Sequence, residues 1–138
     1  MSQTRTYRGS CHCGAVTFEG DFDLSKGVSR CNCTLCLRVG QAGVMVKPAA
    51  FRLLKGAQDL TVYRVGKSPN SRSFCRTCGV HCFGQGDVPE IGGAYVSINT
   101  NCLEDVELAG LPSHHFDGRH DNWMAGTRPE MWPLFRPA

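Results

Sequence analysis

The 138-residue sequence lacks long hydrophobic runs, and its longest apolar stretches, such as residues 43–46, cover only a few positions. A membrane-spanning helix needs about 20 consecutive apolar residues, so the sequence predicts no membrane span and no membrane partner. Residues 1–6 also lack the apolar segment that a secretory signal peptide carries. We therefore expect a cytoplasmic protein.

The sequence also lacks low-complexity segments, linkers, internal repeats and any apolar helical stripe longer than about three turns. Its length is that of one ordinary domain, and such a chain can bury a hydrophobic core without relying on cross-links. We expect a single domain that spans residues 1–138.

Short strands explain most of the pattern that is present. Apolar side chains alternate with polar ones around Val16 and Phe18, and several short runs are rich in β-branched and aromatic residues. Sixteen glycines and seven prolines separate these runs, as turns do. Strands are predicted at residues 15–19, 43–46, 51–54, 60–65, 71–74, 80–83 and 94–98, with one short helix at 35–41. The sequence therefore predicts a mainly β fold.

Nine cysteines are many for a chain of this length. Their odd number and the missing export signal argue against a disulfide framework, and clustered cysteines in a reducing compartment more often bind metal or perform redox chemistry. Thiolates on two zinc ions would also cancel the formal net charge of +3, because metal-bound cysteines are deprotonated. The basic balance therefore gives little support for nucleic-acid binding.

The pair Cys75 and Cys78 is the most specific metal signal, because two cysteines separated by two residues can bind one tetrahedral ion. Gly79 follows, and a glycine there lets the turn fold back and direct amide groups at sulfur. No thioredoxin-like βαβ pattern surrounds the pair, so zinc is favoured over redox chemistry. A structural zinc needs four ligands, and Cys11 and Cys13, at another predicted turn, can supply the other two.

A second cluster, Cys31, Cys33 and Cys36, supplies three thiolates within six residues. Three protein ligands with one open position are typical of a catalytic zinc, whereas a fourth protein ligand would make a closed structural site. Spacing alone leaves these two alternatives open. The residues that could close the site are Cys82, Cys102, His12, His81, His114, His115 and His120.

The C-terminal segment 111–138 holds three of the five histidines and both tryptophans, and we expect it to form irregular, ordered structure over the sheets. Core packing is the preferred interpretation of Trp123 and Trp132. The alternative is that residues 117–123 form a loop lining a ligand pocket, because ordered polar loops often carry functional sites.

Motifs around the three cysteine-containing segments continue through most of the chain. They are residues 9–16 (GSCHCGAV), 31–36 (CNCTLC), 54–56 (LKG), Leu60, Tyr63, 74–81 (FCRTCGVH), 96–99 (VSIN) and 103–105 (LED). This ordered set resembles the glutathione-dependent formaldehyde-activating family, which also includes centromere protein V.

The resemblance implies an all-β fold of several short, coiled antiparallel sheets, similar to that of a small zinc protein that acts on Rab GTPases. The activity it implies is carbon–sulfur bond chemistry, in which glutathione and formaldehyde form S-hydroxymethylglutathione, or the reverse. The zinc ligands it implies are Cys11, Cys13, Cys75 and Cys78 for a structural ion, and Cys31, Cys33 and Cys36 for a catalytic ion.

The leading hypothesis is a zinc-dependent carbon–sulfur lyase that acts on a small thiol, with glutathione as the first choice. Zinc lowers the pKa of a bound thiol, and the thiolate is the nucleophile that attacks an aldehyde carbon. The alternatives are a non-catalytic zinc module with both sites closed, and a redox or metal-transfer protein with exposed thiols.

Candidate acids and bases are His81, His115 and Asp121. The arginines that could offset the charge or bind glutathione carboxylates are Arg30, Arg38, Arg72 and Arg76.

Overall fold

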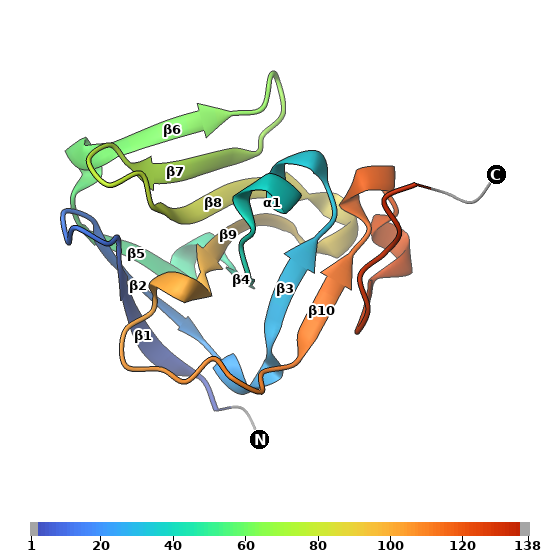
Figure 1. The fold of residues 1–138 in the computed structure, drawn as a ribbon, viewed down its shortest axis with the longest axis horizontal. Coiled ribbons are helices and arrows are strands. Elements are labelled where there is room, and N and C mark those ends of the chain that lie inside the picture. Colours follow the sequence, from blue (N-terminus) through green and yellow to red (C-terminus); the bar gives the residue numbers. More distant parts are fainter. Residues whose placement is uncertain (1–2, 136–138) are drawn as a thin grey trace.

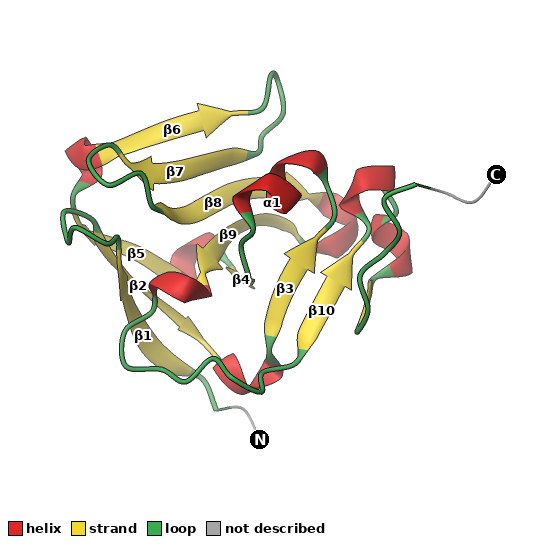
Figure 2. Cartoon of the chain, viewed as in Figure 1, coloured by secondary structure: helices red, strands yellow, loops and turns green. Residues whose placement is uncertain are grey.

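Strands make up most of the regular structure, and they form two sheets (Figures 1 and 2). The computed structural model describes residues 3–135. The smaller sheet has three antiparallel strands in the order β1-β2-β5. These strands are β1 (Arg5–Ser10), β2 (Thr17–Phe22) and β5 (Phe51–Lys55).

The larger sheet has eight strands in the order β11-β10-β3-β4-β9-β8-β7-β6. Neighbouring strands are antiparallel except for β3 and β10, which run parallel. The strands are β3 (Val28–Cys31), β4 (Gly43–Val46), β6 (Leu60–Arg64), β7 (Ser71–Cys75), β8 (His81–Val88), β9 (Gly93–Asn99), β10 (Ser113–Phe116) and β11 (Thr127–Arg128).

Helices are short throughout the described residues. The one α-helix there, α1 (Thr34–Val39), begins after Cys33, whose sulfur accepts a hydrogen bond from the Cys36 amide, and ends at Gly40 with φ 70°. The 3-10 turns are η1 (Leu24–Lys26), η2 (Pro48–Ala50), η3 (Ala57–Asp59), η4 (Pro89–Ile91), η5 (Thr100–Cys102), η6 (Gly118–His120) and η7 (Trp123–Ala125).

The predicted mainly β fold is confirmed, and each of the seven predicted strands overlaps an observed one. The predicted helix at 35–41 corresponds to α1. Two details differ from expectation. The segment after residue 111 is not wholly irregular, because residues 113–116 form β10, and the parallel pairing of β10 with β3 departs from a purely antiparallel arrangement. Strands β1, β3, β10 and β11 contain few apolar residues, which is why periodicity did not predict them.

The hydrophobic core joins the two sheets. Phe18 of β2 is fully buried, and its ring lies near those of Phe51 on β5 and Phe83 on β8. Gly9 on β1 leaves room for this ring, because a Cβ atom at position 9 would lie 2.4 Å from it. Burying one such aromatic side chain stabilises the fold by about 2–3 kcal/mol.

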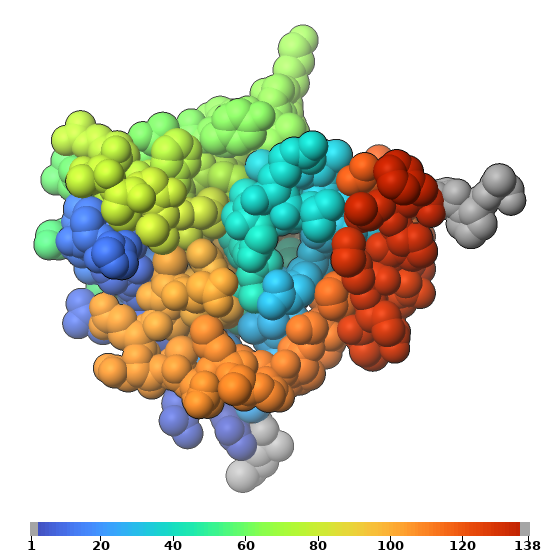
Figure 3. Space-filling model, viewed as in Figure 1, coloured from blue at the N-terminus to red at the C-terminus, as the bar shows by residue number. Residues whose placement is uncertain are grey.

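The parallel pair β3 and β10 positions the candidate site. Cys31 is the last residue of β3 and lies opposite Phe116, the last residue of β10. The segments that follow, α1 and residues 117–123, therefore start side by side although they are far apart in the sequence (Figure 1). The space-filling view shows a hollow bordered by α1, β3 and the C-terminal segment (Figure 3).

Candidate metal centres and ligand pocket

The first cysteine cluster joins two turns from different sheets. Cys11 and Cys13 lie between β1 and β2, whereas Cys75 ends β7 and Cys78 lies in the turn before β8. The four sulfurs lie within 4.8 Å of one another. Cys13 Sγ is 3.6 Å from both Cys11 Sγ and Cys75 Sγ. Zinc–sulfur bonds of about 2.3 Å in a tetrahedron place sulfurs about 3.8 Å apart, so the four cysteines fit a tetrahedral ion.

Backbone amides surround the first cluster and stabilise thiolates. The Val16 amide donates to Cys11 Sγ at 3.3 Å, and the Thr77 amide donates to Cys75 Sγ at 3.4 Å. Hydrogen bonds from the Cys13 and Val80 amides lower the pKa of Cys78 to about 6. Gly79, with φ 75°, permits the tight turn, as its place in the sequence predicted.

The second cluster is assembled by the end of β3 and the start of α1. The sulfurs of Cys31, Cys33 and Cys36 lie within 4.8 Å of one another. The Cys33 amide donates to Cys31 Sγ at 3.5 Å, and the Cys36 amide donates to Cys33 Sγ at 3.2 Å. Because the helix begins at this point, its free amides face sulfur and compensate negative charge.

Charges in the second cluster are unequal when no metal is bound. Hydrogen bonds from the Cys31 and Cys36 thiols lower the pKa of Cys33 to about 2, whereas the same interaction with Cys33 raises the pKa of Cys31. Arg72 from β7 donates through Nη2 to Cys36 Sγ at 3.2 Å. A guanidinium therefore partly offsets the thiolate charge, which suits a site that binds a cation through sulfur.

None of the proposed closing residues joins the second cluster within the part of the chain that the structure describes. No further histidine, cysteine or carboxylate there lies within 4.8 Å of all three sulfurs. Cys82 and Cys102 are instead buried in the hydrophobic core. Spacing could not have separated these roles, because a free cysteine is also a common core residue.

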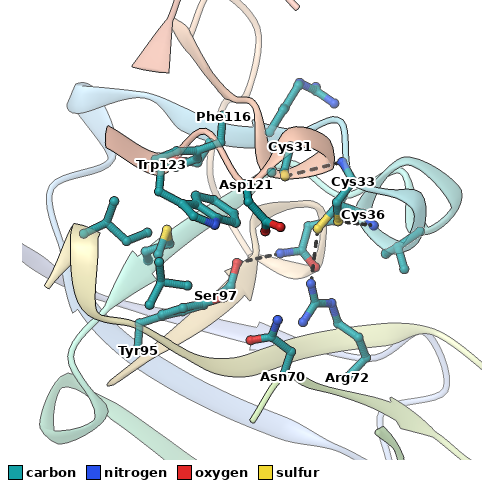
Figure 4. A pocket seen from close by; sticks show the side chains of 18 residues that line it. Cys31, Cys33, Cys36, Asn70, Arg72, Tyr95, Ser97, Phe116, Asp121 and Trp123 are labelled. Atoms are coloured by element: carbon teal, nitrogen blue, oxygen red, sulfur yellow. Dashed lines mark hydrogen bonds between the residues drawn. The ribbon is translucent and has the colours of Figure 1, made fainter. Parts of the chain in front are cut away.

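A cavity of about 180 Å³ lies against all three sulfurs of the second cluster (Figure 4). Its wall combines apolar and polar side chains, as ligand pockets commonly do. The lining residues besides the three cysteines are Ser29, Arg30, Val39, Gln41, Met45, Asn70, Arg72, Val88, Ile91, Tyr95, Ser97, Phe116, Gly118, Asp121 and Trp123.

Residues 117–123 contribute Gly118, Asp121 and Trp123 to this wall, so the segment lines a cavity, as the alternative interpretation predicted. That the cavity binds a ligand stays a prediction. Trp123 is half-buried and lies 5.7 Å from the Phe116 ring, between centroids. The preferred interpretation of Trp123 as a core residue is therefore wrong. Trp132 is also outside the core; its ring lies 4.1 Å from the Arg128 guanidinium, and its Nε1 donates to the His115 carbonyl.

A buried hydrogen-bond network fixes the 117–123 loop to the second cluster. Asn32, between two of the cysteines, donates to Asp117 Oδ1 at 2.8 Å and accepts from the Arg119 amide at 3.0 Å. Asp117 also receives hydrogen bonds from His120 at 2.7 Å and Asn122 at 3.3 Å. Burial opposes ionisation of Asp117, but these hydrogen bonds outweigh it and keep its pKa below the ordinary value. Sequence reasoning did not identify Asn32, although its position inside the cysteine motif is a usable signal.

The three candidate acids and bases occupy different surroundings. Asp121 lines the cavity of about 180 Å³ beside the three sulfurs. His115 borders a smaller cavity beside Cys31 and Cys36, and burial, with Arg30 and Arg128 nearby, lowers its pKa. His81 does not line either cavity, and burial, assisted by the charge of Arg72, lowers its pKa to about 4.

The four arginines also separate into two groups. Arg30 and Arg72 line the cavity beside the three sulfurs. Arg38 is exposed and donates to the Thr34 carbonyl, and Arg76 is exposed and pairs with Asp59 at 3.5 Å. Only Arg30 and Arg72 are therefore placed to contact a ligand beside the second cluster.

The fold and the two clusters define a mainly β protein with two sets of cysteines that could hold metal ions. A family model described as glutathione-dependent formaldehyde-activating enzyme matches residues 6–120, and the chain belongs to this family.

One curated relative carries the same family description, and one solved structure shares the fold. A protein of Halomonas elongata, provisionally assigned as a glutathione-dependent formaldehyde-activating enzyme, is 32% identical over 78 residues, which are 51% of this chain and 50% of that protein. The match thus spans about half the length of this curated relative. A crystal structure of a Rhodobacter sphaeroides protein from structural genomics is 31% identical, with a TM-score of 0.66 over 77% of this chain and 98% of that one.

None of the described helices is long and apolar enough to cross a membrane.

Proposed function

We propose that the protein is a zinc-dependent carbon–sulfur lyase that interconverts a thiol and an aldehyde with their S-hydroxyalkyl adduct. Glutathione and formaldehyde are the first candidates, because the family description names them. The observation that carries the proposal is the second cluster: three sulfurs adjoin a cavity, and no other described histidine, cysteine or carboxylate completes the set.

We propose two zinc ions with different roles. Cys11, Cys13, Cys75 and Cys78 would hold a structural ion, because four sulfurs complete a tetrahedron between two turns. Cys31, Cys33 and Cys36 would hold the catalytic ion and leave one position facing the cavity. When bound there, zinc lowers the pKa of an incoming thiol and holds it as the thiolate.

The protein's own side chains would select and orient the thiol. Arg72 and Arg30 supply positive charge beside the sulfurs, which suits a thiol that carries carboxylates. Phe116 and Trp123 supply an apolar wall on one side of the cavity, which would limit the access of water to the reacting sulfur. We further propose that residues 1–138 act as one domain in the cytoplasm, where thiols remain reduced.

Cobalt substitution of the purified protein tests the proposal. The visible spectrum of the second site should change on titration with glutathione, and exchange between glutathione, formaldehyde and their adduct should accelerate. The variant Cys36→Ser should lose both responses while retaining one metal ion. No spectral response to any thiol, with two closed four-ligand sites, would instead support a non-catalytic zinc module.

A further inference from the structure

Asp121 supplies a free carboxylate to the cavity. Among the described lining residues it is the one carboxylate, and no histidine is present there. Figure 4 shows its carboxylate directed into the cavity on the side of the three sulfurs. The side chain makes no hydrogen bond and no ion pair with the residues that the structure describes, so its oxygens are available to a ligand.

Hydrogen bonds fix the backbone at Asp121, although its side chain is exposed. Its φ of 51° and ψ of 34° place it in the left-handed region, which non-glycine residues adopt infrequently. The Asp121 amide donates to the Gly118 carbonyl, and the Asp117 carbonyl accepts from both the His120 and the Asn122 amides. Asn32 ties Asp117 to the cysteine loop, so the carboxylate and the sulfurs belong to one connected structure.

We propose that Asp121 is the general base and acid of the carbon–sulfur reaction, an assignment that rests on the proposed function. In cleavage, its carboxylate takes the proton of the adduct's hydroxyl group. The electron pair of the O–H bond forms the carbonyl bond of the aldehyde, the C–S bond breaks, and its electron pair leaves on sulfur as the thiolate. In synthesis, the thiolate attacks the aldehyde carbon, and the protonated Asp121 returns the proton to the carbonyl oxygen.

Other polar groups of the cavity are less suited to this task. The Ser97 hydroxyl accepts a hydrogen bond from Gln41 at 2.7 Å. Burial raises the pKa of Tyr95, which keeps that phenol protonated at neutral pH. Guanidinium groups have no acceptor site, so Arg30 and Arg72 cannot take the proton. A positioned carboxylate can accelerate a proton transfer by about 10²–10⁴-fold.

Asp121→Asn tests the assignment with little disturbance of the backbone, because asparagine adopts the left-handed region readily. Asp105→Asn is the matched control, since Asp105 is an exposed aspartate with φ 55° that does not line the cavity. Turnover of glutathione and ¹³C-formaldehyde is measured by exchange NMR, zinc by metal analysis, and thiol affinity by titration of the cobalt-substituted protein. Asp121→Asn should lower kcat by about 10²-fold or more, with zinc content and thiol affinity unchanged and Asp105→Asn like the wild type.

Asp121→Gly provides a second test, whose expected result a merely structural role of Asp121 would not explain. Glycine tolerates the same φ and leaves room for a small carboxylic acid, so added formate should restore part of the lost turnover in this variant alone. Equal kcat in wild type and Asp121→Asn overturns the assignment and leaves the lyase function standing. A loss confined to thiol affinity overturns it in favour of a binding role. A wild-type protein that turns over no thiol adduct overturns both proposals.

Discussion

Gly118 approaches Cys31 so closely that a Cβ atom on Gly118 would lie 2.5 Å from Cys31 Sγ and 2.7 Å from the Trp123 ring. We predict that Gly118→Ala displaces the Cys31 sulfur and weakens metal binding at the second cluster by about 10-fold or more, because outer contacts of this kind orient the ligands. Competition with a chromophoric chelator measures this affinity.

The control for this variant is Gly110→Ala. Gly110 has φ 81° and nothing within 4 Å of the added Cβ atom, so the substitution strains the backbone without touching a sulfur. It should lower stability by about 1 kcal/mol and leave both metal affinities unchanged. Equal metal affinity in Gly118→Ala and the wild type would show that the Cys31 sulfur does not depend on this contact.

The two clusters should respond differently to loss of one ligand. Cys75 is fully buried and ties β7 to the turn between β1 and β2, so Cys75→Ser should lower the melting temperature by more than about 10 °C. Cys33→Ser should remove the second ion with a change of only a few degrees, because serine retains the capping role at the start of α1. Circular dichroism melts combined with metal analysis distinguish the two. A similar loss of stability in both variants would contradict the division of roles.

Local features of the fold could be predicted from the sequence, because they depend on neighbouring residues. Alternation around Val16 and Phe18 indicated β2, and the spacing of Cys75 and Cys78 indicated a hairpin turn. The three sulfurs of the second cluster are also within six residues of one another. In each case the contacts that define the feature are close in the sequence, so pattern and spacing were sufficient.

Long-range features of the candidate site could not be predicted in this way. β3 and β10 pair in parallel, although each contains few apolar residues and they are separated by most of the chain. The contact between Asn32 and Asp117 depends on that pairing. The same limit applies to Cys82, because a thiol near a cysteine motif in sequence can be a ligand or a core residue. Only the tertiary structure decides between these roles.

Loss of Asn32 should loosen the 117–123 loop. In Asn32→Ala, the buried Asp117 carboxylate and the Arg119 amide each lose a hydrogen-bond partner, which should destabilise the protein by about 1–3 kcal/mol. Trp123 should then show red-shifted fluorescence because its side of the cavity opens to water. Chemical denaturation measures stability, and Trp132→Phe removes the second emitter. An unchanged Trp123 spectrum would show that the hydrogen bonds of Asn32 do not hold the 117–123 loop in place.

Removal of the Arg72 charge should make metal binding at the second cluster more sensitive to acid. In the metal-free cluster, the pKa of Cys36 is raised overall. A hydrogen bond with Cys31 lowers this pKa, whereas the interaction with Cys33 and burial raise it by more. The positive charge of Arg72 opposes the increase. Arg72→Gln should therefore raise the thiol pKa, so protons displace the metal at a higher pH, by about one unit. The thiolate–cobalt absorption followed against pH measures the midpoint. Arg38→Gln, which alters an exposed arginine on α1, should leave it unchanged.

His81 is half-buried, and burial of its two ring nitrogens should cost stability in a way that depends on pH. Neither ring nitrogen has a hydrogen-bond partner among the described residues, and burial, with Arg72 nearby, lowers its pKa from 6.5 to about 4. In the unfolded chain the His81 ring binds a proton below about pH 6.5, whereas in the folded protein it binds one only below about pH 4. Acid therefore favours the unfolded state and reduces the stability of the wild type. Between pH 7.5 and 5.5, titration of His81 should lower the free energy of unfolding by about 1 kcal/mol. Contact of the ring with water would make this loss smaller.

Two substitutions distinguish the effect of protonating His81 from the effect of its unsatisfied ring nitrogens. His81→Gln removes the titration but keeps a buried polar group, so it should flatten the pH dependence without raising stability at pH 7.5. His81→Phe removes both, and it should flatten the pH dependence and leave stability at pH 7.5 equal or higher, because no hydrogen bond is lost. Denaturation at the two pH values in excess zinc measures both effects. A fall in stability of about 1 kcal/mol or more in both variants at pH 7.5 would mean that the ring nitrogens are bonded in solution, for example to an ordered water.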